Sequence, residues 1–377
     1  MGSNLHFLTN SLLAVVCAVM GASFLSIHMP KKEGLRSYQI SLRVLAIAYF
    51  AMSLIALTVI SFNLSDNSRE YIPFIITFIS STQALLFSFT LITLINPTFV
   101  KIKNVFFHSL PIFIFLLFYI IFNALFGDPV VTSLNQFFQN INHPTLILRL
   151  LFLGFYVFQL VYYTDLFMKE AQRYDSELLN YFSDVVQLRL KWVRVAFFAA
   201  LFVGFTALIS CFFPKKDDWI FNILYSFFYF LYAQEYIKYN KVYNIVEPVI
   251  QLVPEEDSTV MIKARVKADW DFYKHQIESQ HYYREAGINI EDLASRLRIG
   301  RTTLSNLINR EEGVNFNTWI NQLRIEEAKQ LLLENPDYTI ATISEMVGYT
   351  EQANFSRQFK LITGESPLMW RKKVIAS

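Results

Sequence analysis

Long apolar segments in the first 237 residues constrain this fold more than any other feature of the sequence. A helix that crosses the hydrocarbon core of a bilayer needs about 20 mostly apolar residues. About seven segments meet this requirement, and they lie near residues 5–28, 39–62, 71–95, 105–126, 145–168, 192–213 and 218–237. The sequence therefore predicts a polytopic bundle of transmembrane helices over residues 1–237, with a possible role in sensing.

The basic residues of the short loops predict how these helices are oriented. Lys and Arg favour the cytoplasmic side of a membrane. Alternate loops carry most of them, namely Lys31, Lys32, Arg36, Lys101, Lys103, Lys169, Arg173, Arg189 and Lys191. The loops between these carry only Arg69, Lys215 and Lys216, and residues 127–144 have no Lys or Arg. We therefore expect a multi-pass protein of the inner (cytoplasmic) membrane, with its N-terminus outside and its C-terminal domain in the cytoplasm.

Polar residues within the apolar segments allow two interpretations. Deep in the segments they either line a ligand cavity or form hydrogen bonds between helices; these residues are Gln83, His108, Asn123 and Gln159. Charged residues near the segment ends favour extension toward the membrane surface; these are Arg43, Arg149, Asp165, Arg194 and Glu235. This half of the chain carries no recognisable catalytic motif.

Residues 238–287 connect the apolar half to the remainder of the chain. The stretch 238–258 has two prolines and an acidic cluster, which is typical of a linker. An apolar stripe at helical spacing follows and predicts an amphipathic helix that ends near Gly287; its members are Ile262, Val266, Trp270, Tyr273 and Ile277. The stripe either packs on the following domain, which is the favoured interpretation, or pairs with a second chain.

Residues 288–377 contain a repeated pattern that predicts two helix-turn-helix units. Each of the stretches "INIEDLASRLRIGRTTLSNLIN" and "YTIATISEMVGYTEQANFSRQFK" reads as a short helix, a tight turn and a second short helix. Asn289 is placed to cap the first helix, with Asp292 in a capping-box position. Ala294 and Ser344 are the small residues at which two helices can cross, and Gly348 permits a left-handed turn. The second helices are anchored by Leu304, Leu307 and Ile308 in one unit and by Phe355 and Phe359 in the other.

The stretch between the two units predicts a single long helix that stops at Pro336. Its apolar residues share one side, and they are Phe316, Trp319, Ile320, Leu323, Ala328, Leu331 and Leu332. A rigid spacer between two helix-turn-helix units suits two successive major-groove segments on one DNA face, about 34 Å apart.

These motifs resemble the DNA-binding domain of AraC/XylS-type transcription regulators. The resemblance lies in the "LS..I" core of the first unit, in "W...LRIEEAKQLLL" and, most specifically, in "VGYTEQANFSRQFK...TGESPLMWR", which includes Gly364, Pro367 and Arg371. Three residues depart from the family pattern: Gly300 in place of Ser, Ser344 in place of Ala and Trp370 in place of Tyr. The resemblance covers about a quarter of the chain, and the whole arrangement is similar to membrane-bound AraC-type regulators of bacteria.

The second helix of each unit supplies the residues expected to contact bases. Residues at the start and on the exposed face of such a helix point into the major groove. In the first unit these are Arg301, Thr302, Thr303 and Asn306, and in the second they are Glu351, Gln352, Asn354 and Arg357. Arg suits guanine, Asn and Gln suit adenine, and Glu can accept from cytosine. A solvated helix face is the alternative for each of them.

Contacts with phosphates are expected from a second set of residues, which position the protein without reading sequence. These are Asn309, Arg310, Lys360, Lys372 and Lys373. Ser305 and Ser356 fit phosphate contact or local capping. From residue 259 to the end, however, about sixteen Lys and Arg oppose about fifteen Asp and Glu, whereas DNA-binding domains are often strongly basic. Nonspecific affinity for DNA is therefore expected to be modest.

Taken together, the residues predict an all-α membrane-anchored transcription regulator that couples a membrane or extracytoplasmic signal to gene expression. Its expected partners are double-stranded promoter DNA and the lipid bilayer, while RNA polymerase, a second copy of the chain and a small-molecule or membrane signal remain open. No metal site, cofactor or enzymatic activity is expected, because no nucleophile, carboxylate pair or metal-ligand cluster has suitable spacing. The alternative is a transporter or channel whose C-terminal domain binds another protein; it would require inverted repeats and interrupted helices.

Overall fold

The regular secondary structure is helical in the part of the chain that the structure describes. This computed structural model describes residues 2–27, 36–61, 72–96, 99–184, 191–210, 218–239 and 265–376. Within these ranges the only bridge of β type joins Phe182 to Asn289, so the expected all-α fold is confirmed for them. The chain divides into two compact units, of which one comprises Met1–Gln172 and Leu190–Gln251 and the other Arg173–Arg189 and Leu252–Ser377.

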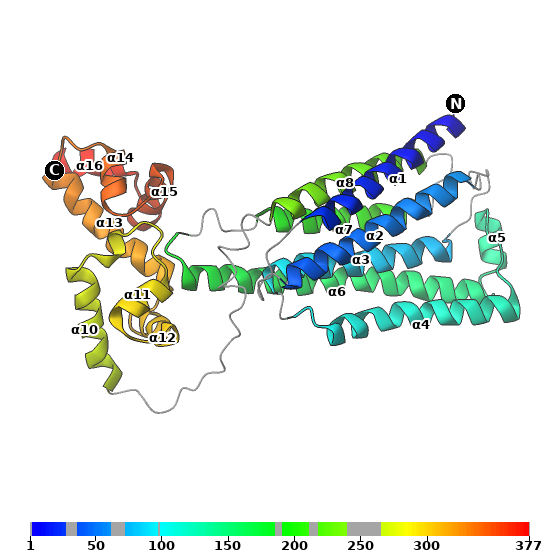
Figure 1. The fold of residues 1–377 in the computed structure, drawn as a ribbon, viewed down its shortest axis with the longest axis horizontal. Coiled ribbons are helices and arrows are strands. Elements are labelled where there is room, and N and C mark those ends of the chain that lie inside the picture. The colour runs from blue at the N-terminus through cyan, green and yellow to red at the C-terminus, as the bar shows by residue number, and fades with distance from the viewer. Residues whose placement is uncertain are drawn as a thin grey trace. The chain divides into compact units, whose positions relative to one another are not determined.

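Long helices lying side by side build the first unit (Figure 1). They are α1 (Gly2–Ser26), α2 (Arg36–Ser61), α3 (Phe74–Ile95), α4 (Ile102–Phe126), α6 (Pro144–Tyr181), α7 (Lys191–Ser210) and α8 (Asp218–Lys238), with the short α5 (Leu134–Gln139) between α4 and α6. Most of the described residues of each segment that the sequence marked as apolar therefore lie within a helix. The last turns of α6 belong to the second unit.

Six of these helices are long and apolar enough to cross a membrane: α1, α2, α3, α4, α6 and α7. Helix α8 is present where the sequence predicts it and carries several tyrosines, but it is not among these six. These tyrosines face inward: the Tyr236 hydroxyl donates to Ser41 Oγ at 2.6 Å, and the Tyr232 hydroxyl lies 2.9 Å from Thr90 Oγ1. Helix α8 is thus bound into the bundle by polar contacts, and the count of seven spans stays a prediction.

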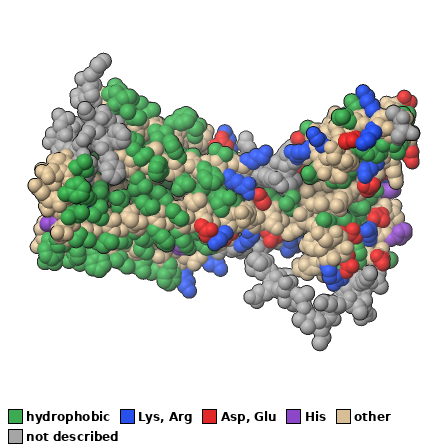
Figure 2. Space-filling view, turned by 180° about the vertical axis from the view of Figure 1, so that it is seen from behind, with side chains coloured by type: hydrophobic (Ala, Val, Ile, Leu, Met, Phe, Trp, Pro, Cys, Tyr) green, Lys and Arg blue, Asp and Glu red, His purple; other side chains and the backbone are tan. Residues whose placement is uncertain are grey.

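The bundle presents a large apolar surface around its long helices (Figure 2). Ile112 is the one buried residue of α4, whereas Phe106, Phe113 and Leu117 of this helix are each more than half exposed. Soluble monomers rarely expose contiguous apolar patches above a few hundred Å². Lys and Arg side chains gather at one end of the bundle in the same view, as expected if that end lies at a membrane surface.

The polar residues within the bundle make different kinds of contact with neighbouring helices and loops. Gln159 and Ser81 exchange hydrogen bonds between α6 and α3, and the Ser81 hydroxyl donates to Gln159 Oε1 at 2.6 Å. The ring of His108 packs on Phe89 at a centroid distance of 5.0 Å. Arg149, near the start of α6, has a side chain that is only 2% exposed and that pairs with Asp128 of the loop after α4. Its extension toward a membrane surface stays a prediction.

The second unit is a set of shorter helices. They are α10 (Arg265–Ser279), the 3-10 turn η2 (Tyr282–Arg284), α11 (Ile290–Leu297), α12 (Arg301–Glu311), α13 (Phe316–Glu334), α14 (Ile340–Met346), α15 (Gln352–Thr363) and α16 (Pro367–Ala376). One of its cores collects eight buried side chains of α13, α14 and α15 and of the turn between the last two: Ile325, Ala328, Leu332, Ile343, Val347, Tyr349, Phe355 and Phe359.

Helix α10 packs on this unit through its apolar stripe. Trp270 and Ile277 are buried, and the Trp270 ring lies 5.3 Å from that of Trp319. The favoured interpretation of the stripe is thus confirmed. The helix ends at Ser279, earlier than expected, because the chain turns through a left-handed residue at His281 and Gly287 forms a later turn. Ile262 and the predicted linker beyond residue 239 lie outside the described residues.

Candidate nucleic-acid interface

The first helix-turn-helix unit consists of α11 and α12. Asn289 caps α11, since its Oδ1 accepts from the Asp292 amide at 2.9 Å and its Nδ2 donates to the Asp292 carboxylate at 2.6 Å. The predicted capping arrangement is therefore confirmed. Leu304, Leu307 and Ile308 are buried and turn the opposite face of α12 outward.

The second helix-turn-helix unit consists of α14 and α15. Its turn has the same construction as the turn between α11 and α12 but differs from it in length. In the first unit the left-handed residue is Arg298 (φ 56°), and in the second it is Gly348 (φ 93°). Ile299 N donates to Ala294 O, and Tyr349 N donates to Ser344 O, so the two turns correspond at an offset of 50 residues. The anchors Leu304 and Phe355 correspond at an offset of 51, because the second turn has one extra residue before its outer helix.

Glycine is required at the second turn for two reasons. The left-handed backbone disfavours a side chain, and a Cβ at Gly348 would overlap the carbonyl group of Arg284. The turn of the second unit therefore approaches the chain that precedes α11. At Gly300 the sequence indicated a missing cap, and no side chain caps the start of α12.

Helix α15 is fixed from its inner face. Phe355 and Phe359 are fully buried, and Phe359 packs against Trp370 of α16 with ring centroids 5.8 Å apart. The Arg371 side chain donates to the Tyr338 carbonyl at 2.9 Å, which ties α16 to the loop after α13. The family signature at the C-terminal end of the domain thus supports the outer helix from behind.

Most of the residues predicted to contact bases are exposed on α12 and α15. The side chains open to solvent are Thr302, Thr303, Asn306, Glu351, Gln352 and Arg357, and Arg301 is half-buried. They gather at the start and on the outer face of the two helices, which is the geometry that base contact requires. Their contacts with DNA remain predictions.

Asn354 differs from the other predicted base-contacting residues because it is buried, with an exposure of 6%. Its Oδ1 accepts a hydrogen bond from the Arg357 guanidinium at 2.7 Å. In the free protein this amide holds Arg357 in place instead of facing the groove. A positioning role therefore fits Asn354 better than direct base contact.

The predicted phosphate contacts fall into two groups. Arg310 pairs with Glu311 and Lys373 pairs with Glu365, each at 2.7 Å, so part of their charge is neutralised in the free protein. Asn309, Lys360 and Lys372 are exposed. Among the described residues, Lys360 and Lys372 form no ion pair, so they are the cations of this set most available to DNA.

Ala353 is a candidate contact that the sequence interpretation missed. It is exposed at the start of α15 and corresponds to Thr302 at the offset of 51 residues. A small apolar side chain there can contact a thymine methyl group. Applying the offset of the two anchors to every position of the outer helices would have found it.

A short segment at the C-terminal end of α6, Tyr181–Asp184, packs against α11 and α13, where the first helix-turn-helix unit meets the long helix. Asn317 Nδ2 donates to the carbonyl oxygens of Phe182 and Ser183 at 3.1 and 2.7 Å, and the Ser183 amide donates to Ile288 O at 3.2 Å. The Tyr181 hydroxyl also donates to Glu291 of α11. This 181–184 segment, far away in sequence, is therefore part of the second compact unit.

Buried polar groups of α13 connect this segment to the second helix-turn-helix unit, which consists of α14 and α15. The Tyr349 hydroxyl donates to Asn321 Oδ1 at 2.6 Å, and Asn321 itself lies beside Asn317. Arg324 donates to the carbonyls of Tyr283 and Glu285 and lies over the Tyr349 ring. Burial lowers the pKa of Arg324, and the neighbouring Tyr349 and Asp184 oppose this shift.

Comparison with known proteins identifies the kind of domain. Residues 293–373 match the family described as a helix-turn-helix domain. The Msm operon regulatory protein of Streptococcus mutans is 29% identical over 145 residues, 38% of this chain and 49% of that protein. The arabinose operon regulatory protein of Escherichia coli is 34% identical over 87 residues, 23% of this chain and 30% of that protein.

A solved structure matches the same part of the chain. It is the C-terminal domain of AraT, a response regulator from Geobacillus stearothermophilus, with 28% identity, 30% of this chain and 88% of that chain covered, and a TM-score of 0.25. The family match and the curated relatives support an AraC-type helix-turn-helix domain in the C-terminal region, and the two relatives are named as operon regulatory proteins. The chain matches about half or less of the length of these curated relatives.

Proposed function

We propose that this protein is a membrane-anchored transcription regulator that binds promoter DNA through its C-terminal domain and responds to a signal at the membrane or outside the cell. The observation that carries this proposal is the presence, in one chain, of six helices apolar enough to span a bilayer and an AraC-type domain whose helices α12 and α15 each have an exposed outer face.

Membrane anchoring is supported by the surface of the bundle. Its outward side chains include many large apolar residues, above all along α4, where a single residue is buried. Exposure of such a surface to water would be unfavourable by about 25 cal/mol for each Å². Lipid removes that cost, so a bilayer is the environment in which this unit is stable.

Orientation in the inner membrane follows from charge. The loops that carry most of the Lys and Arg alternate with loops that carry few, and the basic side is retained in the cytoplasm. This places the N-terminus outside. With α8 as a seventh span, the DNA-binding domain is then in the cytoplasm, where promoter DNA is accessible to it.

Signal coupling is supported by α6. This helix is continuous from Pro144 to Tyr181, and its residues belong to both compact units. The 181–184 segment that follows contacts α11 and α13 through buried hydrogen bonds. Tyr349, at the turn of the second unit, is linked to the same cluster through Asn321. A shift of α6 would therefore change the positions of both helix-turn-helix units, provided that the signal binds one of two states of the protein more tightly than the other.

Membrane vesicles of defined orientation test the proposal. Inverted and right-side-out vesicles from cells that express the full-length protein are incubated with a random double-stranded DNA library, and the retained DNA is sequenced. We expect inverted vesicles to enrich one motif and right-side-out vesicles to enrich none. The double variant Arg301→Ala/Arg357→Ala should lose the motif, whereas Lys329→Ala, which changes a cation of α13 away from the outer helices, should retain it.

Each part of the proposal has its own contradicting result. A protein that remains in the soluble fraction contradicts membrane anchoring. A motif enriched by intact right-side-out vesicles contradicts the orientation. Inverted vesicles that enrich no sequence contradict DNA recognition.

A further inference from the structure

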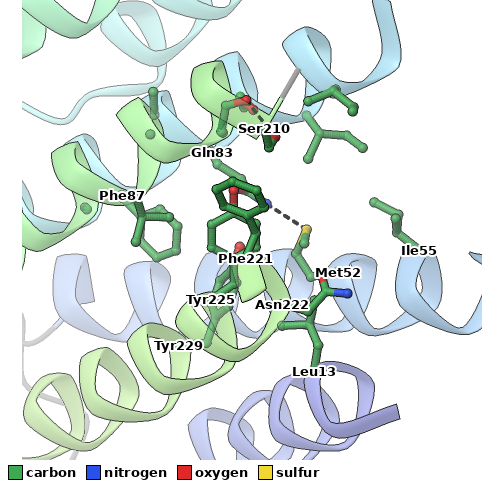
Figure 3. Close-up of a pocket in the computed structure, with 18 of the residues that line it drawn as sticks. Leu13, Met52, Ile55, Gln83, Phe87, Ser210, Phe221, Asn222, Tyr225 and Tyr229 are labelled. Carbon is green, nitrogen blue, oxygen red and sulfur yellow. Dashed lines mark hydrogen bonds between the residues drawn. The ribbon is translucent and has the colours of Figure 1, made fainter. Parts of the chain in front are cut away.

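The helix bundle contains a cavity of about 230 Å³ (Figure 3). It is lined from α1, α2, α3, α6, α7 and α8, all within the first unit. One face of α3 contributes Ser80, Gln83 and Phe87, and α8 faces it with Phe221, Asn222 and Tyr225. Most of the lining is aliphatic or aromatic, as is usual for sites that bind small molecules.

Several polar groups of this lining have hydrogen-bonding capacity that the described residues do not use. Ser80 and Ser88 are buried, with exposures of 8% and 6%, and neither hydroxyl bonds to a described residue. The Asn222 amide likewise has no partner within the described ranges. Gln83 donates only to the sulfur of Met52, at 2.6 Å (Figure 3), and a thioether is a weak acceptor.

Neighbouring polar residues that do not line the cavity are bonded differently. On α3, the Ser81 hydroxyl donates to Gln159 and the Thr82 hydroxyl to Phe78 O. A buried polar group without a partner destabilises a fold by about 1–3 kcal/mol. The unused groups around the cavity are therefore better explained by a molecule that hydrogen-bonds to them than by packing alone.

The cavity lining excludes a charged occupant. It contains no Lys, Arg, Asp or Glu, and an unpaired charge in such surroundings is strongly unfavourable. Its one histidine, His6, is buried and lies beside the Asn10 amide. An occupant must be neutral and able to donate or accept a few hydrogen bonds.

The lining residues also indicate the side from which the cavity is reached. Most of them come from the first half of α1 (His6, Asn10, Leu13), of α3 and of α8 and from the second half of α2 and of α7, while Phe87, Ser88, Phe197, Tyr229 and the α6 residues Tyr156, Leu160 and Tyr163 lie nearer the middle of their helices. In helices of alternating direction these halves lie at the same end of the bundle. With the N-terminus outside, as in the proposed function on which this step rests, that end is the extracytoplasmic one.

We propose that this cavity is the binding site of the regulator's signal, a small uncharged molecule that is mainly apolar and carries a hydroxyl or amide group. Its volume fits roughly ten non-hydrogen atoms, since cavities of about 150 Å³ hold benzene. The apolar body packs among the aromatic residues of α3 and α8, and the polar group bonds with Gln83, Asn222 and the serine hydroxyls.

Fluorine NMR of the full-length protein in phospholipid nanodiscs tests this site with three probes of similar size. These are 4-fluorobenzyl alcohol, the purely apolar 4-fluorotoluene and the charged 4-fluorobenzoate, with empty nanodiscs as the reference for partition into lipid. We expect saturable binding of the alcohol that is stronger than that of 4-fluorotoluene, and no saturable binding of the benzoate.

Two variants and one control variant locate the binding site. Ala200→Phe fills the cavity from α7 and should abolish saturable binding, whereas Ala199→Phe, at the adjacent position outside the lining, should leave it unchanged. Gln83→Leu keeps the size of the side chain and removes its amide, so the alcohol should bind about three- to tenfold more weakly, with no change for 4-fluorotoluene. If Ala200→Phe fails to fold, the result for Gln83→Leu alone decides whether the alcohol binds in this cavity.

The proposal is overturned if the wild type shows no saturable binding of the alcohol, if 4-fluorotoluene binds as tightly, or if Gln83→Leu binds the alcohol unchanged. The measurement contains no DNA. Failure of this site is therefore distinguishable from failure of the proposed regulator function, which the vesicle experiment tests independently.

Discussion

At the residue scale, we expect Arg357 to contribute most to the recognition of DNA. Its guanidinium is exposed on the outer face of α15 and is held by the Asn354 amide at 2.7 Å, so it is ordered before DNA arrives. Arg pairs with guanine through two hydrogen bonds. We expect Arg357→Ala to cost about 1–3 kcal/mol at one base pair and to relax specificity there.

The measurement is the affinity of the full-length protein for its selected site and for every single-base variant of that site. Lys329→Ala serves as the control. A variant Arg357→Ala that is as discriminating as the wild type at every base pair would show that this side chain does not contact a base.

Lys360 lies on the same helix but should act through charge alone. It is exposed and forms no ion pair with a described residue. Each phosphate contact contributes about one unit to the salt dependence of binding. We therefore expect Lys360→Ala to weaken binding to all sequences equally and to lower the slope of log affinity against log salt by about one. An unchanged slope in a salt titration would argue against a phosphate contact.

Ser344 is a position at which stability can be gained. Its side chain is 1% exposed, and its hydroxyl finds no partner among the described residues, whereas Ala294 holds the corresponding place in the first unit. Removing an unsatisfied buried hydroxyl should stabilise the second unit by about 1 kcal/mol or more. Slower hydrogen exchange of the α14 and α15 amides in Ser344→Ala is the expected result.

The reverse change is the matched control for this prediction. Ala294→Ser places a hydroxyl at the equivalent helix crossing, so exchange in α11 and α12 should become faster. If Ser344→Ala exchanges faster than the wild type, its hydroxyl has a partner that stabilises the fold.

At the scale of elements, α6 and the 181–184 segment connect the two parts of the chain. Asn317 donates to two carbonyls of this segment, so Asn317→Leu leaves both without that donor. We expect the segment to detach more often, and the Ser183 amide, which donates to Ile288 O, to exchange about tenfold faster or more. Hydrogen exchange of the full-length protein measures this, and Gln322→Leu, on the exposed side of α13, is the control.

An unchanged exchange rate at Ser183 in Asn317→Leu would mean that these side-chain hydrogen bonds do not hold the segment. The proposed coupling through α6 would then lack its structural basis. Equal effects of Asn317→Leu and Gln322→Leu would point to a general loss of stability in α13.

Elements with local patterns could be predicted from the sequence, and contacts between distant segments could not. The cap at Asn289, the long helix α13 and the anchors Phe355 and Phe359 each follow from spacing within a few turns. The buried amides Asn317 and Asn321 look like solvated helix positions in the sequence, because their partners are backbone carbonyls more than 130 residues away.

The same reasoning explains the difference at α8. Its apolar residues predicted a span, but the sequence does not tell whether a tyrosine faces lipid or a hydrogen-bond acceptor on a neighbouring helix. Tyr229, Tyr232 and Tyr236 are all buried, which only the assembled bundle reveals. At the interface, the exposure of Arg357 was predictable from helix periodicity, and the burial of Asn354 was not.

At the scale of the whole molecule, membrane anchoring changes how a regulator finds its promoter. The DNA-binding domain has a nearly balanced charge over residues 259–377, so its nonspecific attraction to DNA is weak. A tethered domain with weak nonspecific binding depends on base contacts for retention at its site. Regulation by the membrane half then requires that the bundle alter occupancy of the same sites rather than choose different ones.

Genome-wide crosslinking of the full-length protein beside a fragment of residues 259–377 tests this central claim most directly. The fragment retains both helix-turn-helix units and lacks the bundle and the 181–184 segment. We predict peaks at the same sequence motif for both proteins, with occupancy that differs between them. Equal occupancy would contradict regulation by the membrane half, and no enrichment of either protein would contradict DNA recognition itself.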